Sequence, residues 1–332
     1  MGTDGVFLLL RDYAFISMLA TAASFGVNQG YLAAVAPTGS TPPTSMTALQ
    51  TMLLAYGLTY LSSTFRKGGY RSSWFQRLSV WQWLSDGDKG VAFQGRITLS
   101  AGIKLEPRRQ YIFAAFPHGA MTVQHLLTMT DAQGMLSTVH LGDRRDLAAS
   151  VLFLIPVVRE ILLLLGNVDA GAKTAAFNLK KNRSLLIFVG GEKEQLLTRE
   201  YEAKVYLRER YGFIKLAMEF GTPLVPMYAF GENEMYHLSD FLLPARKLLQ
   251  KHLHIGLPLC CGDLFWLPGW PRHRPLDVCI GAPIEVPLVA RENQTREAVE
   301  AVQGTFIAAL EALFEREKAR HGVPPETKLQ VL

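Results

Sequence analysis

Residues 210–236 read RYGFIKLAMEFGTPLVPMYAFGENEMY, and this stretch decides the fold. Residues 213–219 are typical of a helix that Gly221 stops, and residues 224–230 form a short apolar run that ends at Gly231. A short apolar run between turn residues is typical of a buried strand, and a helix directly before it is typical of alternating α/β folds. The stretch therefore predicts one helix–strand unit of an α/β domain.

Two earlier apolar runs repeat this pattern. Residues 111–116 (YIFAAF) end at Pro117, and residues 185–189 (LLIFV) end at Gly190. A further strand is expected at residues 277–286, with helices at 120–129, 192–198 and 297–319. Strands separated by helices predict a mostly parallel sheet with helices on its faces.

Polar residues follow three of these strands directly. His118, Glu194 and Glu232 each come just after a predicted strand. Because ligands of open parallel sheets bind at the carboxyl ends of the strands, we expect these side chains to converge on one crevice.

His118 is the candidate general base of that crevice. A neutral imidazole has a pKa near the working pH, so it can take the proton of a hydroxyl group that attacks a carbonyl carbon. Pro117 fixes the backbone before it, and Gly119 is expected to let a substrate approach closely. The alternative is a structural histidine in a turn.

Glu194, in the run Gly190-Gly191-Glu192-Lys193-Glu194, is the expected partner of the imidazole. A solvated carboxylate in the first turn of a helix is the alternative. Arg159 lies in the apolar run PVVREILLLLG, where it either pairs with Glu160 or faces an anionic ligand.

The composition excludes several classes of protein. A net charge of +5 over 332 residues is too small to predict nucleic-acid binding. The cysteines (Cys260, Cys261 and Cys279) show no metal-site or redox spacing, so we expect reduced thiols and no metal. The sequence contains no P-loop and no Gly-x-Ser-x-Gly nucleophile motif.

The amino-terminal region predicts a membrane hairpin over residues 1–68. Residues 14–36 and 44–65 carry no charge, and each approaches the roughly 20 residues that a membrane-spanning helix needs. The stretch APTGSTPPT between them suits a tight turn. Buried soluble helices are the alternative, with a signal peptide as a second reading of the first span.

Basic residues after the second span place the rest of the chain in the cytosol. Lys and Arg residues stay on the cytoplasmic side of a membrane. Residues 69–110 are expected to lie at the headgroup layer, because they mix basic residues with aromatic ones, with a partly buried soluble helix as the alternative. Residues 111–332 then form a domain that faces the cytosol. The residues behind this prediction are Arg66, Lys67, Arg71 and Arg77, with Tyr70, Trp74, Phe75, Trp81 and Trp83.

Five sequence blocks in order resemble the type-2 diacylglycerol acyltransferase family, which includes monoacylglycerol acyltransferases and some wax-ester synthases. The resemblance runs from about residue 70 to residue 322. The blocks are RSSW and VW at residues 71–74 and 80–81, FPHG at 116–119, PVVRE at 156–160, VGGEKE at 189–194, and the stretch 210–236.

The resemblance implies a glycerolipid acyltransferase-like α/β fold and transfer of an acyl group to diacylglycerol. It implies acyl-CoA as co-substrate, an acylglycerol acceptor and no cofactor. It also implies that the protein resides among membrane lipids in the endoplasmic reticulum membrane, or on lipid droplets. A homo-oligomer is left open. Within the matched blocks, His118 and Glu194 would be catalytic. The substrate-binding residues would be Pro117, Gly119, Arg159, Gly190, Gly191, Glu232 and Asn233.

Some positions depart from the family pattern. Phe116 replaces the first histidine of the family's short motif, and Gln303 and Phe306 stand where His and Tyr are expected. Three readings stay open besides diacylglycerol acylation: a monoacylglycerol or long-chain alcohol acceptor, a phosphate-bearing acceptor, and a catalytically silent lipid-binding relative. From charge alone, we expect the CoA phosphates near Lys173, Lys180, Lys181 or Arg183.

Overall fold

The computed structural model describes residues 56, 57, 59, 60, 68, 71–130, 143–253, 256–267 and 269–332. The chain divides into two units, Met1–Thr64 and Phe65–Leu332, and the second contains the sheet. The membrane span expected at residues 14–36 and nearly all of that at 44–65 lie outside the described residues, as do Arg66, Lys67 and Tyr70. Among the described residues, no helix combines the length and the apolar character needed to cross a membrane.

A mixed, mostly parallel sheet is the centre of the second unit, and its strand order is β1-β10-β7-β2-β5-β3-β4. Strands β7, β2, β5, β3 and β4 are parallel to one another, whereas β10 is antiparallel to β7 and parallel to β1. This confirms the predicted sheet. The strands are β1 (Gln94–Leu99), β2 (Ile112–Phe116), β3 (Arg144–Ala148), β4 (Asn167–Asp169), β5 (Ser184–Phe188), β7 (Leu224–Phe230) and β10 (Pro275–Ile280).

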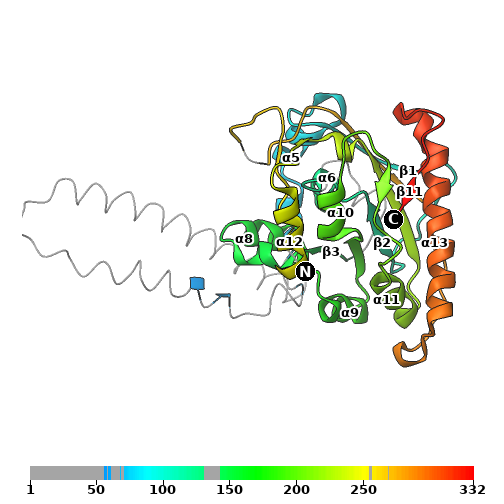
Figure 1. Ribbon diagram of the computed structural model, residues 1–332. Coiled ribbons are helices and arrows are strands. Elements are labelled where there is room, and N and C mark those ends of the chain that lie inside the picture. The colour runs from blue at the N-terminus through cyan, green and yellow to red at the C-terminus, as the bar shows by residue number, and fades with distance from the viewer. Residues whose placement is uncertain are drawn as a thin grey trace, which may run out of the picture. The chain divides into compact units, whose positions relative to one another are not determined.

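Strand β2 lies in the middle of the sheet and is buried on both faces. Ile112, Ala114 and Phe116 join the core cluster on one face, and Phe113 and Ala115 join the cluster on the other, as the period of two in a strand requires. Helices α9 (Ala172–Lys180), α11 (Gly212–Phe220) and α13 (Arg296–Glu317) cover the first face, and α6 (Val123–Met129) covers the second. Figure 1 shows α13 running along the sheet.

Shorter elements complete the unit. Among the described residues, the other α-helices are α4 (Ser73–Gln76), α5 (Ser79–Ser85), α8 (Val158–Leu164), α10 (Gly191–Leu197) and α12 (Leu243–Leu253). The 3-10 turns are η1 (Gly87–Lys89), η2 (Ser150–Leu154), η3 (Glu232–Glu234), η4 (Arg291–Asn293) and η5 (Lys318–His321). Two small sheets pair β6 (Lys204–Val205) with β11 (Gln330–Val331) and β8 (His237–Leu238) with β9 (Cys260–Cys261).

The apolar runs locate the central strands within one residue, but other elements differ from the prediction. The later strand, β10, spans 275–280 instead of 277–286. Strand β1, within residues 69–110, was not predicted, because its sequence QGRITL is not a continuous apolar run like those of the central strands. Helix α6 begins at Val123 instead of residue 120, because Thr122 adopts the left-handed conformation with φ 57°.

Candidate active site

His118 lies in the loop that leaves the carboxyl end of β2, and its side chain is half-buried. Its Nδ1 lies 3.0 Å from the carbonyl oxygen of Gly119. Because a carbonyl only accepts, Nδ1 carries the proton in this geometry, and Nε2 is the basic nitrogen. The Thr122 hydroxyl lies 3.3 Å from Nδ1 and 3.4 Å from Nε2, and the Phe188 ring contacts the imidazole edge-on. Burial lowers the pKa of His118, which favours the neutral imidazole.

Glu194 holds this histidine through the main chain. Its Oε1 accepts a 2.6 Å hydrogen bond from the backbone N–H of His118, and its Oε2 accepts one of 3.1 Å from the N–H of Tyr206. The expected contact was with the imidazole ring, but the carboxylate instead fixes the position of the residue that carries the ring. Burial raises the pKa of Glu194 to about 7, against the opposing effect of these two hydrogen bonds.

Gly190 makes room for that carboxylate. A Cβ atom at residue 190 would overlap the carboxylate and the Cβ of Glu194. Any larger residue would therefore push the glutamate away from the backbone of His118. The structure thus gives Gly190 a packing role beside Glu194, and its expected role in substrate binding stays a prediction.

Glu232 stabilises the other end of the same loop. Its two oxygens accept hydrogen bonds of 2.8 and 2.7 Å from the backbone N–H groups of Val123 and Gln124, at the start of α6. These N–H groups have no partner within a helix, so a carboxylate there acts as a cap. Burial raises the pKa of Glu232 well above its usual range.

Gly119 makes room for the side chain of Glu232, in the same way that Gly190 makes room for Glu194. Gly119 has φ 65°, and a Cβ there would lie 2.5 Å from Oε1 of Glu232. A glutamate side chain therefore fills the space where a Cβ at residue 119 would stand, and the expected approach of substrate at Gly119 stays a prediction.

Two further side chains hold the loop between β2 and α6. Gln195 donates a 2.6 Å hydrogen bond to the carbonyl oxygen of Ala120, and Gln124 donates one to that of Pro117. The loop is therefore fixed through its main chain from several elements. The imidazole of His118 contacts Gly119, Thr122 and Phe188, and these contacts are separate from the hydrogen bonds that fix the main chain.

Among the other predicted site residues, Arg159 pairs with its neighbour. Its Nη1 lies 3.1 Å from Oε1 of Glu160, which realises one of the two expected alternatives. Asn233 donates a 2.8 Å hydrogen bond to the carbonyl oxygen of Glu202. Gly191 begins α10 with φ 56°.

A buried polar cluster next to His118 was missed by sequence reasoning. Arg144 donates to both oxygens of Asp146, at 2.7 and 3.0 Å, and His125 Nε2 lies 3.4 Å from Asp146. The rings of His125 and His118 both contact Phe188, with centroids 4.8 and 6.0 Å away. The only sequence signal was the charged run RRD in a strand that no apolar pattern marked.

A cavity of about 300 Å³ adjoins the loop. Pro117 lines one part of it, and Tyr228, Phe230 and Phe314 form an aromatic wall. Asn233 and the charged residues Glu234, Arg274 and Asp277 also line it. Its mixture of apolar and polar walls suits an amphipathic substrate.

Of the four basic residues expected to bind CoA phosphates, Lys173 lies in the first turn of α9, after the carboxyl end of the parallel strand β4, and the other three lie elsewhere. Lys180, Lys181 and Arg183 directly precede β5, at the amino end of that strand, whereas His118 follows the carboxyl end of the parallel strand β2. They therefore lie at the opposite edge of the sheet from His118. Arg183 also pairs with Asp143 at 2.8 Å.

Comparisons with known proteins agree with one another. The family model described as "Diacylglycerol acyltransferase" matches residues 14–332. Diacylglycerol O-acyltransferase 2-like protein 6 of Homo sapiens is 29% identical over 295 residues, which cover 82% of this chain and 83% of that protein. Diacylglycerol O-acyltransferase 2 of Bos taurus is 32% identical over 282 residues, covering 81% and 76%. 2-acylglycerol O-acyltransferase 3 of Homo sapiens is 31% identical over 283 residues, covering 80% and 79%.

One solved structure is also similar. The 1-acyl-sn-glycerophosphate (LPA) acyltransferase PlsC of Thermotoga maritima aligns with 92% of this chain and 97% of that chain, at 17% identity and a TM-score of 0.39.

Proposed function

The chain belongs to the diacylglycerol acyltransferase family, and from this premise we propose that it esterifies diacylglycerol with the acyl group of acyl-CoA to give triacylglycerol. The protein is an acyltransferase. The observation that carries the finer proposal is the His118 loop, whose main chain is fixed while Nε2 of the ring stays basic.

In the proposed reaction, Nε2 of His118 takes the proton of the acceptor hydroxyl as its oxygen attacks the thioester carbonyl. The C–O bond forms, the tetrahedral intermediate collapses, and the C–S bond breaks. The proton on the imidazole then passes to the CoA thiolate, so no covalent enzyme intermediate is needed. The lowered pKa of His118 supports this role because a base must be neutral before it acts.

Glu194 is a positioning residue in this proposal. It acts on His118 through the backbone N–H, so it sets where Nε2 stands relative to the two substrates. An error of about 1 Å in such a position can cost a factor of about 10² in rate.

The tetrahedral oxyanion needs hydrogen-bond donors. Arg159 is paired with Glu160, so we assign this role to backbone N–H groups around Gly119. That assignment rests on the left-handed turn at Gly119, directly beside the base.

The surface of the described residues suits a lipid interface. Large apolar side chains are exposed, including Trp74 at 65%, Trp83 at 58% and Leu154 at 67%. Exposed aromatic residues are typical of proteins that contact a membrane surface. We propose the endoplasmic reticulum membrane as the location, with residues 1–68 as the membrane hairpin, the site toward the cytosol, and lipid droplets as a second location.

Monoacylglycerol is the second candidate acceptor, favoured by the similarity to 2-acylglycerol O-acyltransferase 3. The test uses the purified full-length protein with radiolabelled oleoyl-CoA. Diacylglycerol, monoacylglycerol, a long-chain alcohol and lysophosphatidic acid are supplied in parallel, and lipid products are separated by thin-layer chromatography.

We expect the highest turnover with diacylglycerol, and none with the His118→Ala variant. Faster turnover of another acceptor would overturn diacylglycerol as the substrate. A folded protein that acylates none of them would instead indicate a lipid-binding relative.

A further inference from the structure

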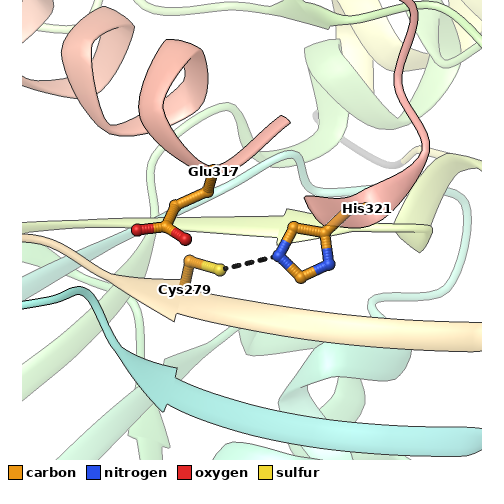
Figure 2. Close-up of side chains that lie close together, drawn as sticks. All are labelled: Cys279, Glu317 and His321. Carbon is orange, nitrogen blue, oxygen red and sulfur yellow. Dashed lines mark hydrogen bonds between the residues drawn. The ribbon is translucent and has the colours of Figure 1, made fainter. Parts of the chain in front are cut away.

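A second cluster of reactive side chains joins β10 to the end of α13. Figure 2 shows Cys279, Glu317 and His321 turned toward one another. One ligand atom from each lies within 4.8 Å of the others, and the first two residues are buried. We propose that this cluster is a zinc site. The proposal is independent of the acyl-transfer reaction.

The measured distance between two of the ligand atoms fits zinc. In tetrahedral coordination, with Zn–S about 2.3 Å and Zn–N about 2.0 Å, sulfur and nitrogen stand about 3.5 Å apart. Cys279 Sγ and His321 Nε2 are 3.4 Å apart. A zinc ion that replaces their shared proton therefore needs little movement of either side chain.

Asp277 orients the histidine for this role. Its Oδ2 lies 3.2 Å from Nδ1 of His321, and the Phe230 ring stacks on the imidazole with centroids 4.4 Å apart and planes at 17°. A carboxylate on Nδ1 keeps the proton there and directs the lone pair of Nε2 toward Cys279. Zinc-binding histidines commonly have such a carboxylate partner.

Glu317 supplies the third ligand. Ser100 and Arg316 contact its Oε1, and Arg320 lies 3.2 Å from its Oε2. Because each carboxylate oxygen has two acceptor positions, the Glu317 carboxylate retains acceptor positions for a metal. The helix spacing explains the placement, since Glu317 and His321 are four residues apart and share one face of the chain where α13 passes into η5.

The donor set selects zinc among common cations. A thiolate disfavours Mg²⁺ and Ca²⁺, which prefer oxygen ligands, whereas Cys, His and carboxylate together suit Zn²⁺. The thiolate and Glu317 neutralise the charge of the ion. His321 and Asp277 line the cavity, so a water molecule from it can occupy the fourth position.

Sequence reasoning predicted no metal because Cys279 stands far from the other two ligands along the chain. The whole of α13 separates β10 from Glu317. Only the packing of that helix on the sheet brings the ligands together, so no short spacing motif exists.

The first test measures metal in the full-length protein, purified with a tag that contains no histidine and without chelators. We expect about one zinc per chain by inductively coupled plasma mass spectrometry. Cys279→Ser and Glu317→Gln should remove most of it, and Cys261→Ser, which changes an exposed thiol, should retain it.

A second measurement needs no variant. After zinc is removed with a chelator, cobalt(II) added to the wild-type protein should give the near-ultraviolet absorption of a cobalt–thiolate bond. Asp277→Asn should weaken zinc binding by about 10–100-fold in a chelator competition, because Asp277 is a positioning residue. A folded wild-type protein with less than about a tenth of a zinc per chain and no cobalt–thiolate band would overturn the proposal.

Discussion

His118 and His321 lie in the same unit, but the protein holds them in different ways. The main chain of His118 is fixed by Glu194, Nδ1 of its ring faces the Gly119 carbonyl oxygen, and Nε2 has the Thr122 hydroxyl 3.4 Å away. Both ring nitrogens of His321 are engaged, one by Asp277 and the other by Cys279. A general base needs a ring nitrogen that can reach a substrate, whereas a metal ligand needs a ring that is held in one orientation.

The pKa shifts of the two histidines follow from these contacts. Burial lowers the pKa of His118. At His321 burial acts in the same direction, but hydrogen bonds to Asp277 and Cys279 outweigh it and raise the pKa to about 9 in the metal-free protein. One imidazole is therefore neutral near pH 7, and the other is protonated there unless a metal replaces the proton.

The largest expected effect is on the rate, at His118 itself. His118→Ala removes the general base, which is worth a factor of about 10²–10⁴ in turnover. The matched control is His252→Gln, an exposed histidine in α12 that should keep the wild-type rate. Steady-state assays with oleoyl-CoA measure both. Turnover within a few-fold of wild type for His118→Ala would remove it from the mechanism.

The next effect concerns the hydrogen bond by which Glu194 fixes the backbone N–H of His118. Gly190→Ala places a Cβ on the carboxylate of Glu194, and such overpacking costs about 3 kcal/mol of stability. The melting temperature should fall, and the zinc content of the folded fraction should not change. Gly304→Ala is the control, because a Cβ at that helical position meets no described atom within 4 Å. If Gly190→Ala melts like wild type, the Glu194 carboxylate can move aside without a loss of stability.

How far sequence predicts structure differs between the two histidines. Strands β2, β5 and β7 are continuously apolar, so their carboxyl ends could be located, and with them His118, Glu194 and Glu232. Convergence at one edge follows from parallel strands alone.

The contacts within the site could not be predicted in the same way. Glu194 binds a backbone N–H, and main-chain partners leave no pattern in side-chain identities. The His321 cluster depends on where α13 ends against the antiparallel strand β10, which is a result of packing.

The pH dependence of stability should report on Glu194. Its pKa, raised to about 7 by burial, means that the folded protein holds a proton that the unfolded chain releases near pH 4.5. Stability from this group is thus fully present below about pH 4.5 and is lost as pH rises through about 7, by roughly 3 kcal/mol at most.

Thermal melting between pH 5 and pH 8.5 measures this loss. Because Glu232 is buried with the same sign of shift, the informative quantity is the difference between the wild type and Glu194→Gln. The variant should show a shallower decline with rising pH. Parallel declines would show that Glu194 does not titrate in this range.

The smallest expected effect lies at Thr122, whose hydroxyl contacts the imidazole of His118. Thr122→Val removes that hydrogen bond, worth about 1 kcal/mol, so kcat should fall about fivefold. The pH profile of kcat should shift at the same time, because the hydroxyl contacts both ring nitrogens. A lower melting temperature with an unchanged pH profile would instead indicate a structural role.

Each of the two buried glutamates occupies the volume of a missing side chain, Glu194 over Gly190 and Glu232 over Gly119. Each glycine and its acid should therefore change together during evolution. In a mutational library that varies one position at a time, substitutions at these two glycines and two glutamates would all be destabilising. A library that enlarges residue 190 while shortening residue 194 would recover folded proteins that single-site scanning cannot reach.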